Sequence, residues 1–335
     1  DDDDLRDYVF KQDVEVYFAG ETVLDNGLTV GARIELEGQT STDQIDAVYA
    51  YVSGGFGELR FGDTGEALAQ LCYLVPSASG IFGADSPNFN FSNSGVSGPL
   101  GPIGYGATNG TCYGVDDKST KIVYFSPNFA GFSFAASFTP DDTEDTRNTL
   151  NGAGTRFSND ANENSENLSV AANFTRDFSG IDVVAGGGAT WSFDRENDDL
   201  DPGPGVVPSG ADEREEYNAY ARVGYAGFTL GGAYSYRKNT LINGADSQVY
   251  GAGITYNWDA WTIGLGWSHG DYEFFQPTPP DITDDYDIFT LTGSYALGPG
   301  IQIDAAVEYY DYKHDEEEFE DYQAISVGIG TLISF

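Results

Sequence analysis

The sequence predicts an all-β protein that spans a membrane as an antiparallel β-barrel. Three observations point to this fold. Apolar residues alternate with small or polar ones along many segments, tight turns alternate with long polar connections, and no apolar run is long enough for a transmembrane helix. In a barrel strand only every second residue faces lipid, so such a protein keeps a low mean hydropathy.

The closing segment, 322–335, shows the alternation clearly. Its odd positions carry Ile325, Val327, Ile329, Ile333 and Phe335, whereas most even positions between them are small or polar. Alternation places these two sets on opposite faces of a strand. A strand that runs out to a C-terminal aromatic residue favours a barrel over a soluble sandwich, because the ends of soluble domains usually fray.

Hairpins repeat along the rest of the chain. Seven tight turns, rich in the Asn, Asp and Gly that positive φ angles favour, lie at 24–27, 54–57, 128–131, 177–180, 225–227, 257–260 and 297–300. The predicted strands cover 5–23, 28–38, 44–53, 58–63, 118–126, 131–139, 166–177, 181–194, 215–225, 227–238, 246–257, 261–273, 285–297, 301–312 and 321–335. Short turns alternate strictly with long connections, which is typical of an up-and-down barrel, whereas a Greek-key sandwich would mix the two.

Aromatic residues gather beside the tight turns. The set is Phe56, Phe129, Phe132, Phe178, Tyr225, Phe228, Trp258 and Trp261. Ordinary packing at hairpin ends would explain a few of them. Their recurrence at nearly every turn favours an interfacial girdle on the short-turn side of the barrel.

The strand count is odd, although bacterial single-chain barrels usually have an even number. We expect sixteen strands, of which fifteen are visible and the first is missing from the sequence. That strand would pair with both 5–23 and 321–335. The alternatives are that 5–23 is bent and counted wrongly, or that it pairs directly with 321–335 in a distorted seam.

The formal net charge is −39, from 54 acidic and 15 basic residues. Nucleic acid is excluded as a partner, because phosphate binding needs basic patches. The acids cluster at 1–4, 141–145, 194–201, 281–287 and 315–321. The simplest interpretation is solvated loops. Carboxylates also suit Ca²⁺ and Mg²⁺, which leaves divalent-cation binding on these loops open, although no spacing matches an EF-hand; no cofactor is expected.

The segment 64–117 is far too long for a simple hairpin connection, and long loops of this kind are usually functional. It contains Cys72 and Cys112, the only cysteines, whose even count suggests a disulfide and an oxidising compartment. It also carries apolar residues that an exposed loop would not need. We therefore expect one barrel domain, 1–335, in which 64–117 folds into the lumen as a constriction loop.

Charged residues at inward positions would then line the pore. The acids of the loop are Glu66, Asp85, Asp116 and Asp117, and the basic residues that alternation points inward are Lys11, Arg33, Arg60, Lys121, Arg222 and Arg237. Opposed charges across a narrow lumen set a transverse field and an ion preference. Charges on the lipid face would cost several kcal/mol, which supports the inward assignment of the set.

Catalysis is not expected. The chain has two histidines, His269 and His314. In the sequence Ser268-His269-Gly270-Asp271, neighbouring strand residues point to opposite faces, so Ser268 and His269 are poorly placed for a catalytic dyad. A channel with a saturable solute site, or a surface receptor whose acidic loops hold cations, stays open as an alternative function.

Several motifs resemble Gram-negative general diffusion porins of the alphaproteobacterial type. They are Asp25–Ala32 (DNGLTVGA), Tyr124–Phe132 (YFSPNFAGF), the terminal Phe335 and, most tellingly, Val52–Asp63 (VSGGFGELRFGD) just before the long loop. The resemblance covers the whole chain. The sequence departs from the family pattern at the N-terminus, where the family's first strand is absent.

The resemblance implies a sixteen-stranded homotrimeric porin in the bacterial outer membrane, with the third long loop forming the constriction. It also implies that Phe335 acts as an assembly signal for the barrel-assembly machinery. The expected partners are the lipid bilayer, lipopolysaccharide, two further copies of the chain, and small hydrophilic solutes that diffuse passively. The strong negative charge adds an expected preference for cations.

Overall fold

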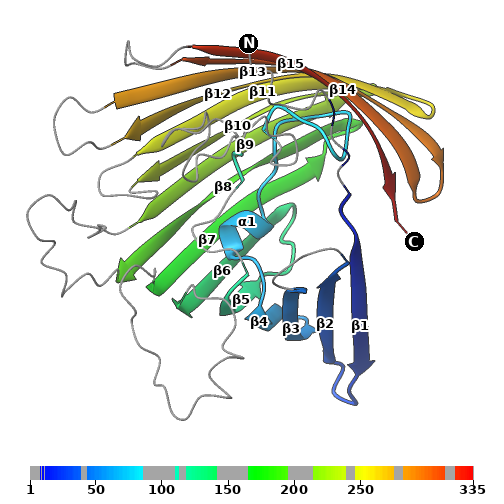
Figure 1. Ribbon diagram of the computed structural model, residues 1–335. Coiled ribbons are helices and arrows are strands. Elements are labelled where there is room, and N and C mark those ends of the chain that lie inside the picture. Colours follow the sequence, from blue (N-terminus) through cyan, green and yellow to red (C-terminus); the bar gives the residue numbers. More distant parts are fainter. Residues whose placement is uncertain are drawn as a thin grey trace, which may run out of the picture.

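The computed structural model describes residues 8, 10, 12–38, 44–85, 110–112, 118–141, 165–194, 214–238, 246–274, 282–313 and 321–334. These residues form one antiparallel sheet of fifteen strands, each hydrogen-bonded to the next along the chain. The sheet curls into an incomplete cylinder, and its concave side holds a short helix, α1, with the chain around it (Figure 1).

The strands follow one another without a crossover. Their bounds are β1 (Glu15–Val23), β2 (Thr29–Glu37), β3 (Ile45–Gly54), β4 (Gly57–Asp63), β5 (Thr120–Phe125), β6 (Phe132–Asp141), β7 (Ser165–Asp177), β8 (Ile181–Asp194), β9 (Glu215–Tyr225), β10 (Phe228–Lys238), β11 (Ser247–Trp258), β12 (Trp261–Phe274), β13 (Ile282–Gly298), β14 (Ile301–Lys313) and β15 (Tyr322–Ile333). Helix α1 covers Ala67–Gln70. Among the described residues, no helix has the length and apolar character needed to cross a membrane.

Fourteen of the predicted strands agree with the observed ones to within three residues at each end. The exception is the first, predicted to start at residue 5, which starts at Glu15. Its partner β2 ends at Glu37, directly opposite Glu15, and just beyond this pair the amide of Gly38 donates to the carbonyl of Val14. The alternation near residue 5 could not reveal this limit, because it is set by the neighbouring strand.

The sheet order places β1 and β15 at opposite edges, and within the described residues these two strands do not pair with each other. The described residues of β1 and β15 therefore show no distorted seam, and for the rest of 5–23 this alternative stays untested. The sixteenth strand stays a prediction.

The tight turns have the backbone that their residues favour. Between β9 and β10, Ala226 and Gly227 have φ angles of 50° and 85°, and Tyr225 pairs directly with Phe228. Two consecutive positive φ angles match the twist of a two-residue hairpin. The turn fixes the register of both strands, and this register decides which side chains face inward.

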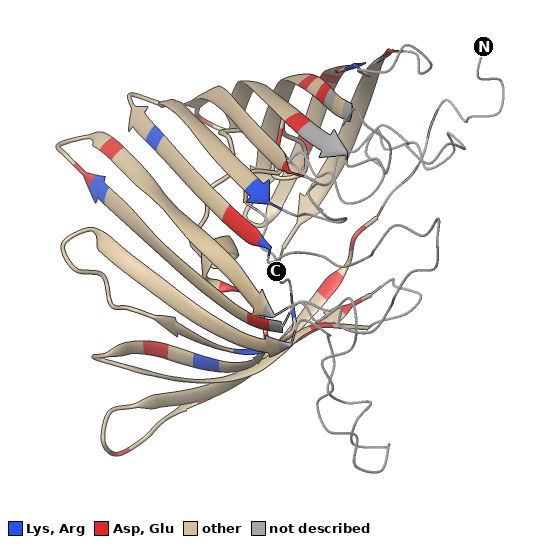
Figure 2. Ribbon diagram, turned by 90° about the vertical axis from the view of Figure 1, so that its left-hand side faces the viewer, with Lys and Arg blue, Asp and Glu red and all other residues tan. Residues whose placement is uncertain are grey.

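The burial pattern of the sheet is the reverse of that in a soluble protein. The convex face exposes large apolar side chains, such as Leu265 at 58% and Val327 at 77%. The concave face buries polar ones, including Ser268 and Thr290. Charged residues are sparse along most of the strand length (Figure 2). An apolar exterior around a polar interior is the arrangement of a transmembrane barrel.

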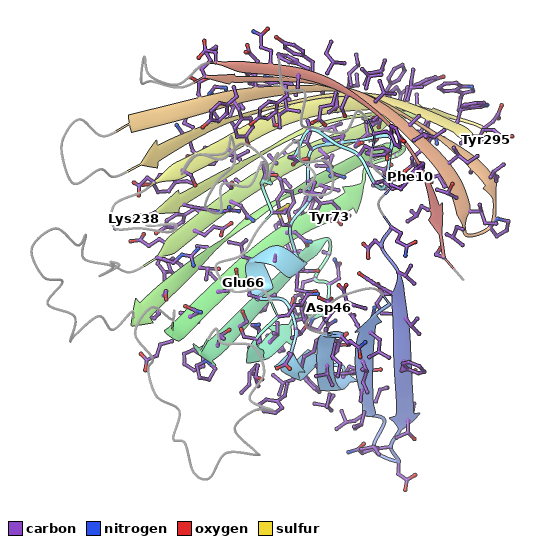
Figure 3. The ribbon with its side chains drawn as sticks, viewed as in Figure 1. Phe10, Asp46, Glu66, Tyr73, Lys238 and Tyr295 are labelled. Carbon is purple, nitrogen blue, oxygen red and sulfur yellow. A yellow bond between two sulfur atoms is a disulfide. The ribbon has the colours of Figure 1, made fainter. Side chains whose placement is uncertain are left out.

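Aromatic rings form a nearly continuous chain at the short-turn ends of β10 to β13. The ring centroids of Phe228 and Tyr256 lie 4.3 Å apart, and those of Trp261 and Tyr295 lie 4.5 Å apart. Trp258 lies between the two pairs, 5.6 Å from Tyr256 and 6.5 Å from Trp261. Tyr295 marks this end of the barrel in Figure 3. Such a row suits the membrane interface, where the rings contact both lipid and water.

Candidate functional site: the inner wall and residues 64–85

The chain that follows β4 is attached to the concave wall from its first turn. The amide of Ala67 donates to Ser137 Oγ at 3.0 Å, and the amide of Leu68 donates to Ser169 Oγ at 2.9 Å. These amides belong to the first turn of α1, where no intrahelical partner exists. Hydroxyl groups of β6 and β7 therefore cap the helix and fix it against the wall.

The same segment reaches the far side of the barrel ten residues later. The amide of Ala78 donates to Thr292 Oγ1 on β13 at 3.1 Å. Asp304 on β14 receives two hydrogen bonds at one oxygen, Oδ2, from Ser79 Oγ at 2.7 Å and from the amide of Gly80 at 2.9 Å. Asp304 is fully buried. Residues 64–85 thus run across the inner wall from β6 to β14.

Inward-facing glycines make room for this segment. A Cβ atom placed on Gly251 of β11 would lie 3.0 Å from Val75 Cγ2, and one on Gly330 of β15 would lie 2.7 Å from Ile81 Cδ1. Both distances are shorter than ordinary van der Waals contact. Glycines without side chains therefore leave space on the wall for Val75 and Ile81 of the segment.

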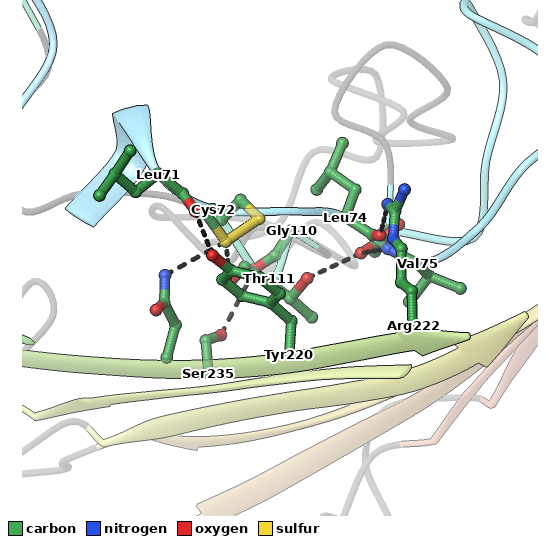
Figure 4. The surroundings of a disulfide bond; sticks show 12 residues. Leu71, Cys72, Leu74, Val75, Gly110, Thr111, Tyr220, Arg222 and Ser235 are labelled. Atoms are coloured by element: carbon green, nitrogen blue, oxygen red, sulfur yellow. Dashed lines mark hydrogen bonds between the residues drawn. A yellow bond between two sulfur atoms is a disulfide. The ribbon is translucent and has the colours of Figure 1, made fainter. Parts of the chain in front are cut away.

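Cys72 and Cys112 form a disulfide, with their Cα atoms 5.5 Å apart. The bond lies over β9 and β10, where Tyr220 Oη donates to the carbonyl of Leu71 (Figure 4). The ring of Tyr73 lies 5.3 Å from that of Tyr220. Figure 3 shows Tyr73 and Glu66 on the concave side of the sheet. The disulfide joins the part of the segment around Cys72 to residues 110–112.

Asp85 is buried between Val75 and Thr111, with 1% of its surface exposed. Its Oδ2 accepts hydrogen bonds from the amide of Val75 and from Thr111 Oγ1, both at 2.7 Å. Burial raises the pKa of the Asp85 carboxyl, opposed in part by the two hydrogen bonds and by the charge of Arg222. Asp85 is a link inside the folded segment and is shielded from the open lumen.

A pH prediction follows from Asp85. A carboxyl with a raised folded-state pKa binds its proton more readily in the folded protein, so its contribution to stability is largest below the ordinary pKa and falls as pH rises through the raised value. Asp85→Asn should remove this dependence, because the amide oxygen can accept both hydrogen bonds that Oδ2 accepts. We expect equal or greater heat resistance of the variant at neutral pH.

The measurement is the temperature at which the folded form is lost on electrophoresis, recorded across acid to neutral pH. Asp85→Ala is the control, since it leaves both donors without their acceptor and should lower stability at every pH. An Asp85→Asn profile parallel to that of the wild type would contradict the prediction.

Beside the start of the segment lies a cavity of about 280 Å³ with a basic lining. The residues that line it are Arg33, Glu35, Ala47, Tyr49, Arg60, Thr64, Gly65, Gln70 and Lys118. Each cationic side chain has a carboxylate partner. Arg33 Nε lies 2.7 Å from Glu35, Arg60 Nε lies 2.5 Å from Glu58, and Lys118 pairs with Asp46.

Aromatic rings hold the guanidinium groups of this cavity in place. Arg60 Cζ lies 5.0 Å from the ring centroid of Tyr49 and 4.5 Å from that of Phe125, and Arg33 Cζ lies 4.4 Å from that of Tyr17. Cation–π contact of this kind adds attraction and restricts rotamers. The cavity therefore presents fixed positive charges, with their carboxylate partners beside them, to the water of the lumen.

The remaining predicted basic residues have structural contacts. Lys121 is buried, and its Nζ donates to the carbonyls of Thr64 at 2.5 Å and Ser119 at 2.6 Å. Arg237 pairs with Glu216 at 3.4 Å. The guanidinium of Arg222 donates to the carbonyl of Leu74 and lies 5.1 Å from the ring of Tyr73.

Glu66 is also buried against the wall, where Thr190 Oγ1 of β8 donates to its Oε2 at 2.9 Å. Lys11, Asp116, Asp117 and Phe335 lie outside the described residues. The structure thus brings Arg33 and Arg60 together at one cavity and Asp85 near Arg222. Glu66, Lys121 and Arg237 each lie elsewhere on the wall.

Sequence reasoning missed several residues of this site. The predicted pore-lining residues include neither Lys118, the first residue of the predicted strand 118–126, nor Asp304, which lies within the predicted strand 301–312. Hydroxyl residues on the wall, such as Ser137, Ser169 and Thr292, were not singled out. Their signal is the concentration of Ser, Thr and Gly at inward positions of β6 to β13, which marks a wall that another segment covers.

Known proteins agree with this architecture. The Gram-negative porin family model matches residues 1–315. No curated protein matches the sequence. In vitro-folded OmpT, an outer membrane protein of Vibrio cholerae, is similar with a TM-score of 0.61 at 14% identity, covering 96% of this chain and 89% of that chain. The anion-selective porin from Comamonas acidovorans has a TM-score of 0.58 at 14% identity, covering 95% and 87%.

At these identities the solved structures support the fold alone, and they are barrels of the kind that the inside-out burial indicates. The family match extends over nearly the whole sequence and therefore shows the family as well as the fold. The chain therefore belongs to the Gram-negative porin family, whose members are non-enzymatic channels of the bacterial outer membrane.

Proposed function

We propose that the chain forms a water-filled channel for the passive diffusion of small hydrophilic solutes and ions, and that 64–117 is the loop that narrows it. The observation that carries the proposal is the attachment of 64–85 to the inner wall from β6 to β14, beside a cavity lined by charged and polar groups. A segment fixed there occupies lumen space, and polar walls suit hydrated solutes.

A preference for cations is the second part of the proposal. The net charge of −39 and the acid-rich segments attract cations to the channel. The basic cavity opposes the attraction of cations only weakly, because carboxylates lie beside its cationic groups. The fixed charge of the whole protein should then decide the sign of the selectivity.

Assembly and partners belong to the same proposal. One form of OmpT from Vibrio cholerae is described as a trimer, with a TM-score of 0.60 at 13% identity, and covers 96% of this chain and 91% of that one. We propose a homotrimer for this chain, surrounded by the lipid bilayer and lipopolysaccharide. Phe335 would be read by the barrel-assembly machinery.

Planar-bilayer recording tests this function. We expect currents that rise linearly with salt and a zero-current potential, under a salt gradient, of the sign for cation preference. Glu58→Gln, which removes the carboxylate beside Arg60, should shift this potential toward anions, and the matched Arg60→Gln should shift it toward cations.

Absence of conductance would overturn the channel, and an anion-selective wild type would overturn the cation preference. Saturable block of the current by one solute would favour the alternative of a channel with a dedicated solute site or a cation-binding receptor. The two variants should keep the folded electrophoretic mobility of the wild type, so that a changed potential reports charge and not misfolding.

A further inference from the structure

A histidine and several carboxylates converge on the outer surface of the barrel, away from the lumen. His269 belongs to the same face of β12 as the exposed Leu265, and residues of this face alternate with inward ones such as Ser268. In the sheet register, His269 lies directly opposite Asp287 of β13, and Asp271 lies directly opposite Asp285. These residues occupy the ends of the strands toward the long loops.

We propose that His269, Asp285 and Asp287 form a binding site for a divalent transition-metal ion of the zinc class. One ligand atom from each of the three side chains lies within 4.8 Å of the other two. His269 Nδ1 lies 3.1 Å from Asp287 Oδ1. Tetrahedral zinc with bonds of about 2.0–2.1 Å needs neighbouring ligands about 3.3 Å apart, so His269 and Asp287 already have suitable spacing and Asp285 would move closer to them.

Carboxylates face one another across neighbouring strands at this place. Asp271 is directly opposite Asp285, and Asp287 is directly opposite Asp311. Like charges in such positions destabilise a sheet. Lys313 offsets part of the charge, but its Nζ is 3.7 Å from Asp285 Oδ1, beyond hydrogen-bond distance. A bound divalent cation would offset the remaining negative charge.

One carboxylate oxygen of the cluster lacks a hydrogen-bond partner, and the histidine has a carboxylate oxygen beside each ring nitrogen. Asp285 Oδ1 is shielded from solvent and has no hydrogen-bond partner among the described residues. His269 has carboxylate oxygens beside both ring nitrogens, since Nε2 lies 3.1 Å from Asp271 Oδ1. A neutral imidazole has only one N–H, so it can donate to only one of these two carboxylates, and its other nitrogen offers a lone pair.

The surroundings orient the ligands. Trp267 Nε1 donates to Asp287 Oδ1 at 2.8 Å, Gln248 Nε2 donates to Asp271 Oδ2 at 2.8 Å, and the ring of Tyr250 lies 5.1 Å from that of His269. Partners of this kind fix ligand side chains around a metal. Imidazole with carboxylates suits zinc, whereas Mg²⁺ and Ca²⁺ prefer oxygen ligands alone. The metal would join β12 to β13 at the outer surface.

Zinc titration of untagged, detergent-folded protein tests the site, after chelator treatment and in an excess of Mg²⁺ that occupies other carboxylates. We expect one Zn²⁺ per chain, and a tetrahedral absorption spectrum with Co²⁺. His269→Gln and Asp287→Asn should each weaken binding at least about 10-fold. His314→Gln, which changes the other histidine, should bind zinc as the wild type does.

Each variant is titrated only after its folded electrophoretic mobility is shown, and Asp285→Asn replaces either one that fails to fold. Absence of a stoichiometric site in the wild type would overturn the proposal. Binding that survives His269→Gln but is lost in His314→Gln would overturn it as well. Conductance plays no part in these measurements, so the outcome is independent of the channel function.

Discussion

Asp304→Ala is expected to detach the far part of the loop from the inner wall and to raise single-channel conductance. Asp304 is buried, and its Oδ2 is the acceptor for both Ser79 Oγ and the amide of Gly80. The substitution leaves these two donors without their acceptor, at a cost of about 1–3 kcal/mol each. The segment can recover hydration by moving into the lumen water, where it no longer holds its place against β14.

The matched control is Asp304→Asn. Its side-chain oxygen can take the position of Oδ2 and keep both hydrogen bonds, while its amide group faces Gln302, whose own amide can turn to accept. We therefore expect a conductance close to that of the wild type. Equal conductance in Asp304→Ala and wild type would show that this contact does not position the loop. Equal increases in both variants would show that the charge of Asp304 acts directly on permeation.

The fold is predictable from the sequence because its main determinants are local. Alternation in 28–38 or 301–312 shows which residues share a face, and turns such as Ala226-Gly227 fix the register of the hairpin. The start of β1 was not predictable in this way, because it depends on where β2 ends. Alternation also indicates that Arg33 and Arg60 face inward, which is where the cavity lies.

The path of the loop could not be predicted, because it is determined by contacts between distant segments. Asp304 and Ser79 are separated by 225 residues. An inward aspartate has the same sequence pattern whether it faces water or accepts hydrogen bonds from a loop. The cluster of His269, Asp285 and Asp287 on the outer surface likewise depends on contacts between different strands. His269 and Asp287 meet through strand pairing, while the local run Ser268-His269-Gly270-Asp271 indicates only which residues share a face.

Reduction of the Cys72–Cys112 disulfide is expected to leave the barrel intact and to increase fluctuations of the open-channel current. The two cysteines are separated by 40 residues. For a loop of this size, loop-closure entropy gives the cross-link about 4 kcal/mol of stabilisation. The hydrogen-bond ladders of the fifteen strands do not include either cysteine, so the wall should keep its structure when the bond is opened.

The contacts that depend on the bond lie close to it. Thr111, next to Cys112, donates to Asp85, and Ser235 Oγ of β10 donates to the carbonyl of Gly110 at 3.5 Å. Among the described residues, these hydrogen bonds are what holds 110–112 once the cross-link is opened, and a net hydrogen bond contributes only about 0.5–1.5 kcal/mol. The loop limb should therefore exchange between attached and detached positions, which gives current noise more than a uniform increase in conductance.

The measurement compares one channel before and after a reductant is added to the bath. The double variant Cys72→Ser/Cys112→Ser should resemble the reduced wild type and should not respond to the reductant. Asp304 holds the same segment at its far end, so the two constraints should be coupled. Adding Asp304→Ala to the double serine variant should raise conductance by more than the sum of the separate effects. A strictly additive result would mean that the two ends of the segment move independently, and that neither one fixes the position of the other.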